Sequence, residues 1–182
     1  MVTIWADAGG IHDDLTEPSD LDDWLDAIGV DRHGVAATRD EFVRARALRD
    51  SVRRLAALVT ADKRSAAAVE PADPAQAVRT VNAAARELPA PELKLGADGL
   101  DFAAEPPRSP VIAGLAGVAV QAQHLLGRDT PVLQACLAPG CILYFARTHP
   151  RREWCSVECG NRARAARHYQ KVRTGRSRPK AR

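Results

Sequence analysis

The sequence predicts a mainly α-helical protein: a helical N-terminal domain with a small β-hairpin, followed by a small C-terminal module built on four cysteines. Three observations support this fold class. Apolar residues recur at helical spacing in four segments of the N-terminal part, and one segment alternates apolar and polar residues around a turn. All four cysteines lie within one short stretch near the C-terminus. Only 4% of the residues are aromatic, so we expect a core of Leu, Val and Ala on packed helices.

Two helices are expected in the first third of the chain, after about 15 residues that show no periodic pattern and that we expect to form a polar loop. The first helix should begin near Ser19 and Asp20 and end at Gly29, with an apolar face of Leu21, Trp24, Leu25 and Ile28. The second should begin near Thr38, with an apolar stripe of Phe42, Ala45, Leu48, Val52, Leu55 and Leu58.

A third helix and the hairpin are expected next. The helix should begin at Asp73 or Pro74, and Pro89 and Pro91 should stop it. Residues 92–105, ELKLGADGLDFAAE, alternate apolar and polar residues on either side of an Ala-Asp-Gly turn, which predicts a β-hairpin.

The fourth helix should begin at Ser109 and Pro110, because proline is favoured in a first helical turn, and should end at Gly127. Its apolar stretch, Val111 to Leu126, is the longest in the chain, but it contains Gln121, Gln123 and His124. It is therefore too polar to predict a membrane span.

The four cysteines have the spacing of a structural zinc site. Two pairs, CLAPGC and CSVECGNR, have the patterns C-x4-C and C-x3-C with thirteen residues between them. Each pair can bring two thiolates to one point, and four thiolates complete a tetrahedral shell with no position open for chemistry. We expect one Zn²⁺ per chain, with the ligands Cys136, Cys141, Cys155 and Cys159.

Two disulfides or a redox-active pair would use the same cysteines. The acidic start, MVTIWADAGGIHDD, lacks the basic and apolar regions of a signal peptide, so we expect a cytoplasmic protein with reduced thiols. A redox-active pair more often has the spacing C-x2-C. Zinc is favoured over an iron–sulfur cluster because the two paired loops suit a single tetrahedral ion.

Within this module we expect a turn at Pro139-Gly140, a strand over residues 142–145, a hairpin turn over 147–151 and a return strand over 152–154. Ser156 should cap a final helix whose first turn contains Cys159. A knuckle, a hairpin and a helix that carries the second ligand pair form a treble-clef-like arrangement.

The charge distribution indicates an acidic partner for the C-terminal part. Residues 151–182 have 11 Lys/Arg and 2 Asp/Glu, a balance of +9, whereas residues 1–150 have a balance of −6. A basic end on an acidic body is typical of contact with nucleic acid. A solvated basic tail that aids solubility is the alternative.

The last helix should present two different faces. At about 100° per residue, Arg164, Arg167 and Lys171 share one stripe, with His168 beside it, and this stripe could follow phosphates. Arg162 and Tyr169 lie on the opposite side. We expect Arg162 to brace the thiolates, Asn161 to hydrogen-bond the knuckle and Tyr169 to pack against the module. A merely solvated basic helix would show the same pattern.

The run WCSVECGNRARAARHYQKVR, with CLAPGC upstream, resembles the CGNR zinc finger over about residues 132–173. The segments LDDWLDAIG, ARALRDSVRRL and TVNAAA are similar to ABATE, the helical domain that precedes this finger in bacterial stress-induced transcriptional regulators. The N-terminal strand expected of that domain, with its Phe-x-Asn-Thr-like segment, is absent as a pattern; this chain has TIWADAGGIHDDL instead. The resemblance implies zinc binding and DNA binding.

These observations divide the chain into an ABATE-like domain (1–131), a CGNR zinc finger (132–173) and a basic disordered tail (174–182). The function that fits best is a zinc-dependent DNA-binding transcriptional regulator without enzymatic activity. It would contact DNA through Arg164, Arg167, Lys171, Arg162 and His168. The helical domain would sense a small-molecule effector or form a homodimer. The alternatives are a zinc-stabilised adaptor for protein or RNA, and an enzyme with a small-molecule site in the helical domain.

Overall fold

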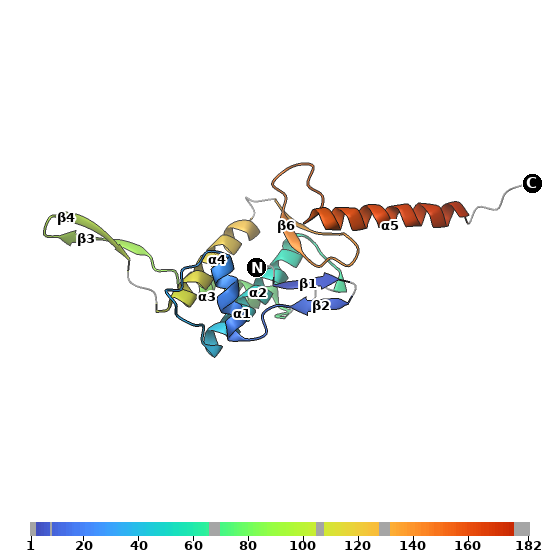
Figure 1. Cartoon of the computed structure of the whole chain (residues 1–182). Helices are drawn as coiled ribbons and strands as arrows, with labels where there is room; N and C mark the ends of the chain where they lie inside the picture. The colour runs from blue at the N-terminus through green and yellow to red at the C-terminus, as the bar shows by residue number, and fades with distance from the viewer. Residues whose placement is uncertain (1–2, 8, 66–69, 105–107, 128–131, 177–182) are drawn as a thin grey trace, which may run out of the picture.

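The computed structural model describes residues 3–7, 9–65, 70–104, 108–127 and 132–176 (Figure 1). Its order of elements is β1 (Ile4–Asp7), β2 (Gly10–Asp13), α1 (Pro18–Ala27), α2 (Arg39–Val59), α3 (Pro74–Ala85), β3 (Pro91–Gly96), β4 (Gly99–Ala104), α4 (Pro110–Leu126), β5 (Leu133–Ala135), β6 (Tyr144–Ala146) and α5 (Val157–Arg176). The chain is mainly helical, as predicted. None of these helices has the length and hydropathy to span a bilayer.

The helices α2, α3 and α4 each begin at a residue whose side chain accepts a hydrogen bond from a backbone N–H of the first turn. Thr38 and Glu41 form a reciprocal capping box at α2, and Asp73 and Ser109 accept backbone hydrogen bonds at α3 and α4. Proline follows the cap of α3 and of α4, as the sequence predicts. The helix α1 begins slightly earlier than expected, at Pro18, and Asp20 in its first turn reaches back to the chain before it.

The four helices bury one continuous core of small and aliphatic residues. Among the described residues, Phe42 is its one fully buried aromatic side chain, and the partly buried Trp24 packs against it. Leu21, Leu25, Ala45 and Leu48 come from the predicted stripes of α1 and α2, whereas Leu15 lies in the segment between β2 and α1. Two members of the expected stripes lie outside this core and are exposed, namely Ile28 and Leu58. The real apolar faces are therefore narrower than the periodicity indicates.

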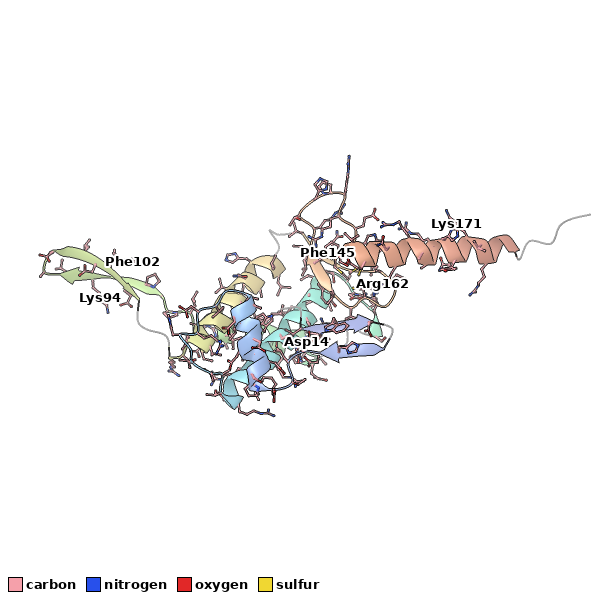
Figure 2. All side chains as sticks on the ribbon, viewed as in Figure 1. Asp14, Lys94, Phe102, Phe145, Arg162 and Lys171 are labelled. Atoms are coloured by element: carbon pink, nitrogen blue, oxygen red, sulfur yellow. The ribbon has the colours of Figure 1, made fainter. Side chains whose placement is uncertain are left out.

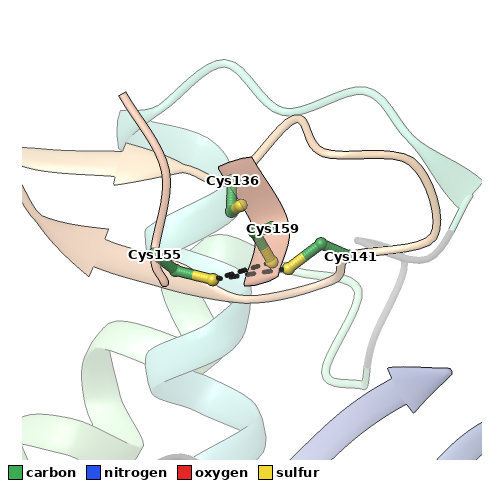
Figure 3. A group of neighbouring side chains, drawn as sticks. All are labelled: Cys136, Cys141, Cys155 and Cys159. Atoms are coloured by element: carbon green, nitrogen blue, oxygen red, sulfur yellow. Dashed lines mark hydrogen bonds between the residues drawn. The ribbon is translucent and has the colours of Figure 1, made fainter. Parts of the chain in front are cut away.

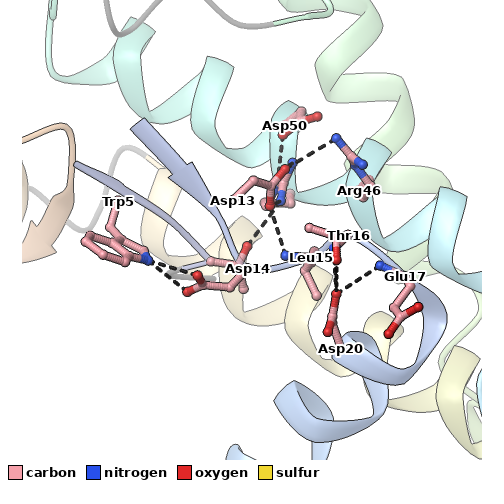
Figure 4. A network of polar contacts seen from close by, with 11 residues as sticks. Trp5, Asp13, Asp14, Leu15, Thr16, Glu17, Asp20, Arg46 and Asp50 are labelled. Atoms are coloured by element: carbon pink, nitrogen blue, oxygen red, sulfur yellow. Dashed lines mark hydrogen bonds and ion pairs between the residues drawn. The ribbon is translucent and has the colours of Figure 1, made fainter. Parts of the chain in front are cut away.

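The expectation of an irregular N-terminal loop is wrong. The strands β1 and β2 form an antiparallel hairpin, in which Trp5 pairs with His12 and stacks on it at 4.2 Å. The polar side chains of this hairpin contact neighbouring residues. The indole Nε1 of Trp5 donates to Asp14 (Figure 4). The guanidinium of Arg49 in α2 donates to Asp13 at 2.6 Å. A hairpin therefore forms although the sequence shows no apolar alternation, because tertiary hydrogen bonds satisfy the polar side chains of its strands.

The predicted hairpin at residues 92–105 is confirmed as β3 and β4, which pair from Pro91↔Ala104 to Gly96↔Gly99. It projects from one end of the body, and α5 projects from the other (Figure 1). Cross-strand partners Leu93 and Phe102, and likewise Leu95 and Leu100, lie on one face of the ribbon. This apolar face is solvent-exposed, with Leu95 85% accessible and Phe102 74% accessible.

The strand pairing inside the C-terminal module differs from the prediction. The strand β6 begins at Tyr144 and pairs with β5, which precedes the first cysteine, with Ala135 opposite Tyr144. Residues 152–154 form no return strand; the segment turns back on itself, as Arg152 N donates to His149 O at 2.9 Å. The hairpin therefore closes over the first cysteine pair, and a loop leads to α5.

The tail that was expected to be disordered from residue 174 begins within a helix. The helix α5 continues to Arg176, so the first three residues of that segment are helical. Residues 177–182 lie outside the described part of the chain.

Candidate metal centre and basic helix

The structure brings all four cysteines together, with their sulfur atoms within 4.8 Å of one another (Figure 3). The Sγ atoms of Cys141 and Cys155 are 3.7 Å apart, and those of Cys155 and Cys159 are 3.4 Å apart. A tetrahedral ion with Zn–S bonds of about 2.3 Å would place its sulfurs about 3.8 Å apart. These distances and four thiol donors fit one zinc ion, and the full set of ligands leaves no coordination position for a substrate.

Two short backbone motifs deliver the thiols. Gly140 has a φ of 74°, the left-handed conformation that glycine adopts without strain, and the turn is closed by Cys141 N donating to Ala138 O at 2.9 Å. At the start of α5, Ser156 Oγ accepts from Cys159 N at 3.2 Å. Both the predicted turn and the predicted cap therefore orient ligands.

The electrostatic surroundings favour ionisation of one thiol. Burial raises the pKa of Cys141 to about 11, and burial likewise raises the pKa of Cys155. At Cys159 burial also opposes ionisation, but hydrogen bonds, led by that from Cys155 and including one from Arg162, lower the pKa to about 7. Because zinc binds thiolates, metal binding should displace protons from the more resistant thiols.

Arginines beside the cluster compensate for thiolate charge. The Nη2 atom of Arg162 donates to Cys159 Sγ at 3.0 Å, which is the bracing contact expected from the sequence. Arg152 Nη2 donates to the carbonyl of Cys155 at 2.9 Å. The expectation for Asn161 is wrong, because its side-chain oxygen accepts from Arg164 at 2.6 Å and does not reach the knuckle.

Gly160 permits the close approach of α5 to the module. A Cβ atom at this position would lie 3.2 Å from Trp154 Cδ1 and 3.3 Å from Arg164 Nη1. The tryptophan before the third cysteine therefore packs directly on the first turn of α5. This contact accounts for the neighbouring Trp, Cys and Gly residues of the sequence pattern.

A clasp that the sequence analysis missed ties this module to the body. Arg64, just beyond the end of α2, donates to the carbonyls of Cys136 at 2.8 Å and Cys141 at 2.6 Å. Its guanidinium is held by Asp62, which also accepts from the hydroxyl of Tyr144 at 3.0 Å. Arg64 and Cys136 are 72 positions apart, so the sequence provides no periodic signal that links them.

The Asp62 clasp yields a stability prediction. The Arg64 and Tyr144 hydrogen bonds lower the pKa of Asp62 to about 2, and its side chain is 1% exposed. Relative to an unfolded value near 3.9, this shift corresponds to about 2–3 kcal/mol. A group with a depressed pKa stabilises the fold above its unfolded pKa, and its contribution disappears as pH falls through the folded value.

We therefore expect Asp62→Asn to lower the free energy of unfolding at pH 7 by about 2 kcal/mol, measured by chemical denaturation. The difference between parent and variant should vanish between about pH 4 and pH 2. Asp40→Asn is the matched control, since its ion pair with Arg44 is exposed and should contribute little. Equal effects of the two substitutions would contradict the role of the clasp.

The predicted basic face lies on the solvent-exposed part of α5. Cys159, Gly160 and Ala163 anchor the first turns, whereas Arg164, Arg167, His168 and Lys171 are exposed. Figure 2 shows Arg162 near the base of the helix and Lys171 well out along it. Tyr169 is 72% exposed, so the expectation that it packs against the module is wrong.

Comparison with family models places both parts of the chain. Residues 1–129 match ABATE, described as "Putative stress-induced transcription regulator", and residues 133–172 match the CGNR zinc finger. A comparison with curated proteins finds no match. The first match covers well over half of the chain, and the second contains all four cysteines described above. The chain therefore belongs to the ABATE family, and its C-terminal module is a CGNR zinc finger.

Proposed function

We propose that this protein is a cytoplasmic, zinc-dependent DNA-binding transcription regulator without enzymatic activity. The observation that carries the proposal is a projecting helix, α5, whose exposed cations are fixed at one end by the four-cysteine cluster (Figure 2). At about 1.5 Å per residue its 20 residues extend about 30 Å, and a major groove about 12 Å wide admits one helix. The family description supports the regulatory part.

Selection of bound sequences from random duplex DNA, with the zinc-loaded protein, tests the proposal directly. Enrichment of a common motif supports a regulator that reads DNA. Equal retention of all sequences, with tighter retention of single-stranded RNA, would favour an RNA adaptor. Recovery of no nucleic acid at low salt would contradict the proposal and would favour a protein-binding adaptor.

Single substitutions on the basic face should act through phosphate contacts. We expect Arg164→Ala, Arg167→Ala and Lys171→Ala each to weaken DNA binding and to reduce the salt slope by about one unit, with little change of sequence preference. His168 lies beside this face and should add a smaller effect. Fluorescence anisotropy over a series of salt concentrations measures both quantities.

Arg162 should behave differently because its guanidinium contacts Cys159 Sγ. Arg162→Ala should lower zinc retention as well as DNA affinity. Measurement of zinc loss to a chelator distinguishes the two roles. If the variant retains zinc as firmly as the parent and loses only DNA affinity, Arg162 contacts DNA and does not stabilise the zinc site.

We further propose that the body forms a homodimer through the apolar face of the β3–β4 hairpin. This face consists of Leu93, Leu95, Leu100 and Phe102, each at least 68% exposed. A single two-stranded hairpin is at best marginally stable in water, so a cover for this face is expected. A second copy offers an identical apolar face, and a two-fold axis joins two identical patches.

The size of the apolar face suits a reversible dimer. Burying eight such partly exposed side chains, at about 1.5–3 kcal/mol for a fully buried one, yields on the order of 10 kcal/mol. This is comparable with the association cost of about 4–15 kcal/mol. Two copies would also carry two basic helices, as dimeric DNA-binding proteins do on paired half-sites.

Leu95→Glu should convert the dimer to a monomer, because it places a charge at the centre of the apolar face. Lys94→Glu is the matched control, since Lys94 pairs with Asp101 on the opposite face of the same ribbon. Sedimentation equilibrium measures the result. A parent protein that remains monomeric at high concentration, or a Leu95→Glu variant that still dimerises, would contradict this arrangement.

A further inference from the structure

A cavity of about 210 Å³ lies at the seam between the helical body and the zinc module. Two of its walls come from α2 and α4, and the third comes from residues 143–146 of the module. The walls are largely apolar and include Val52, Ala56, Val118, Ala122, Leu126 and Phe145. The cavity is separate from the four-cysteine cluster, and neither the metal site nor the basic face uses it.

One charged residue lines this cavity among the residues described, and it is Arg53 of α2. Its side chain is 6% exposed, and its Nε atom has no hydrogen-bond partner. The guanidinium makes one long hydrogen bond, from Nη2 to Ile142 O at 3.4 Å, and lies 5.9 Å from the ring of Tyr144. In the described part of the chain it forms no ion pair with a carboxylate.

Arg49, one turn earlier on the same helix, provides an internal comparison. It is 1% exposed, and its guanidinium is satisfied by Asp13 at 2.6 Å and by Asp50 at 2.9 Å. Burial lowers the pKa of Arg53, whereas these partners outweigh burial and raise the pKa of Arg49. Arginine nevertheless stays protonated in proteins, so Arg53 is a buried cation without a carboxylate in contact, and Asp50 and Asp13 act on it only at longer range.

We propose that this cavity binds a small apolar monocarboxylate, whose carboxylate pairs with Arg53 and whose hydrocarbon part lies between α2 and α4. The carboxylate would accept from the guanidinium of Arg53, a planar group that favours charge-assisted hydrogen bonds with carboxylates. A second charge on the ligand would be buried in apolar walls without a partner, which excludes dicarboxylates and phosphates. A cavity of about 150 Å³ accommodates benzene, so this one has room for benzoate or hexanoate.

The position of the cavity explains what such a ligand would do. It would contact α2 and α4 on one side and the β6 strand on the other, and β6 belongs to the module that carries α5. Binding would therefore strengthen the attachment of the module to the body. This regulatory meaning rests on the proposed function, whereas the binding itself is measured without DNA, so the two can fail separately.

Titration calorimetry of the full-length, zinc-loaded chain with benzoate tests the proposal, with benzyl alcohol as the uncharged analogue. We expect one benzoate per chain and an affinity for benzyl alcohol that is weaker by about tenfold or more. Arg53→Met keeps the length of the side chain but removes the charge, and it should weaken benzoate binding by a similar factor. Arg44→Met, an exposed arginine of the same helix outside the cavity, should leave binding unchanged.

Val118→Phe provides a second variant, because it fills the cavity and keeps the charge of Arg53. This variant should not bind benzoate. Hexanoate and phenylacetate should likewise bind to the parent and not to this variant. The melting temperature of Arg53→Met should be unchanged or higher, since the substitution removes an unpaired buried charge. If that variant fails to fold, Val118→Phe and the comparison with benzyl alcohol decide the question.

Three outcomes would overturn the proposal. The first is equal binding of benzoate and benzyl alcohol, which would show that the charge of Arg53 has no role. The second is unchanged benzoate binding in Arg53→Met or in Val118→Phe. The third is the absence of binding for benzoate, phenylacetate and hexanoate at millimolar concentrations.

Discussion

Cys155→Ser is expected to release the metal and to unfold the zinc module while the helical body keeps its structure. Structural zinc contributes about 10–16 kcal/mol to the folding of small modules. The buried cluster of this module consists of Cys136, Ala138, Cys141, Phe145 and Cys159, so three of its five members are themselves ligands. Without the metal, little apolar core remains to hold the module together.

Metal analysis and limited proteolysis check this result. The parent should contain about one zinc per chain, and the variant should release a protease-resistant fragment that ends shortly before β5. Ser156→Ala is the matched control, because loss of a helix cap costs only about 1 kcal/mol. If the whole variant chain melts together, the clasp of Asp62 and Arg64 has joined the two parts into one cooperative unit.

Removal of the Asp13 charge should have the second large effect, a loss of up to about 3 kcal/mol of stability. Asp13→Asn leaves the guanidinium of Arg49, which is 1% exposed, with Asp50 as its remaining carboxylate partner among the described residues. Losing one of the two carboxylates that balance a buried cation is costlier than losing a surface ion pair. Chemical denaturation of the variant at pH 7 measures this loss.

Asp7→Asn is the control for this experiment. Asp7 belongs to the same N-terminal hairpin, but its contact with His12 is exposed, so the loss of stability should be much smaller. The double variant Asp13→Asn/Arg49→Met should recover part of the lost stability, because it also removes the buried guanidinium that Asp13 balances. A double variant less stable than Asp13→Asn alone would show that Arg49 stabilises the core through its packing rather than through its charge.

The sequence allowed prediction of the parts of this fold that depend on local chemistry. Helix caps such as Thr38 and Ser156, the Pro139-Gly140 turn and the cysteine spacing each specify a backbone conformation within a few residues. The hairpin at residues 92–105 follows from the same kind of signal. These predictions are confirmed because no distant partner was needed to make them.

The features that escaped prediction depend on distant partners. The pairing of β5 with β6 was missed because β5 lies before the first cysteine. With three residues, β5 is too short to show the alternation that predicts a strand. The N-terminal hairpin was missed because tertiary contacts, above all that of Arg49 with Asp13, satisfy its polar residues. The different situations of Arg49 and Arg53 are likewise invisible in a helical pattern that places both beside the apolar stripe.

Two triple variants of equal charge test directly whether the zinc-fixed face of α5 binds DNA. The first is Arg164→Ala/Arg167→Ala/Lys171→Ala, and the second removes three exposed arginines of the body, Arg39, Arg44 and Arg79. Both lose three positive charges, so a general electrostatic effect would act on both alike.

The measurement is the DNA affinity of the zinc-loaded proteins across a series of salt concentrations. If this face of α5 binds DNA, the α5 variant should lose most of its affinity and about three units of salt slope, whereas the body variant should keep a slope close to that of the parent. An α5 variant that binds DNA as tightly as the parent at moderate salt would show that this face of α5 does not bind DNA.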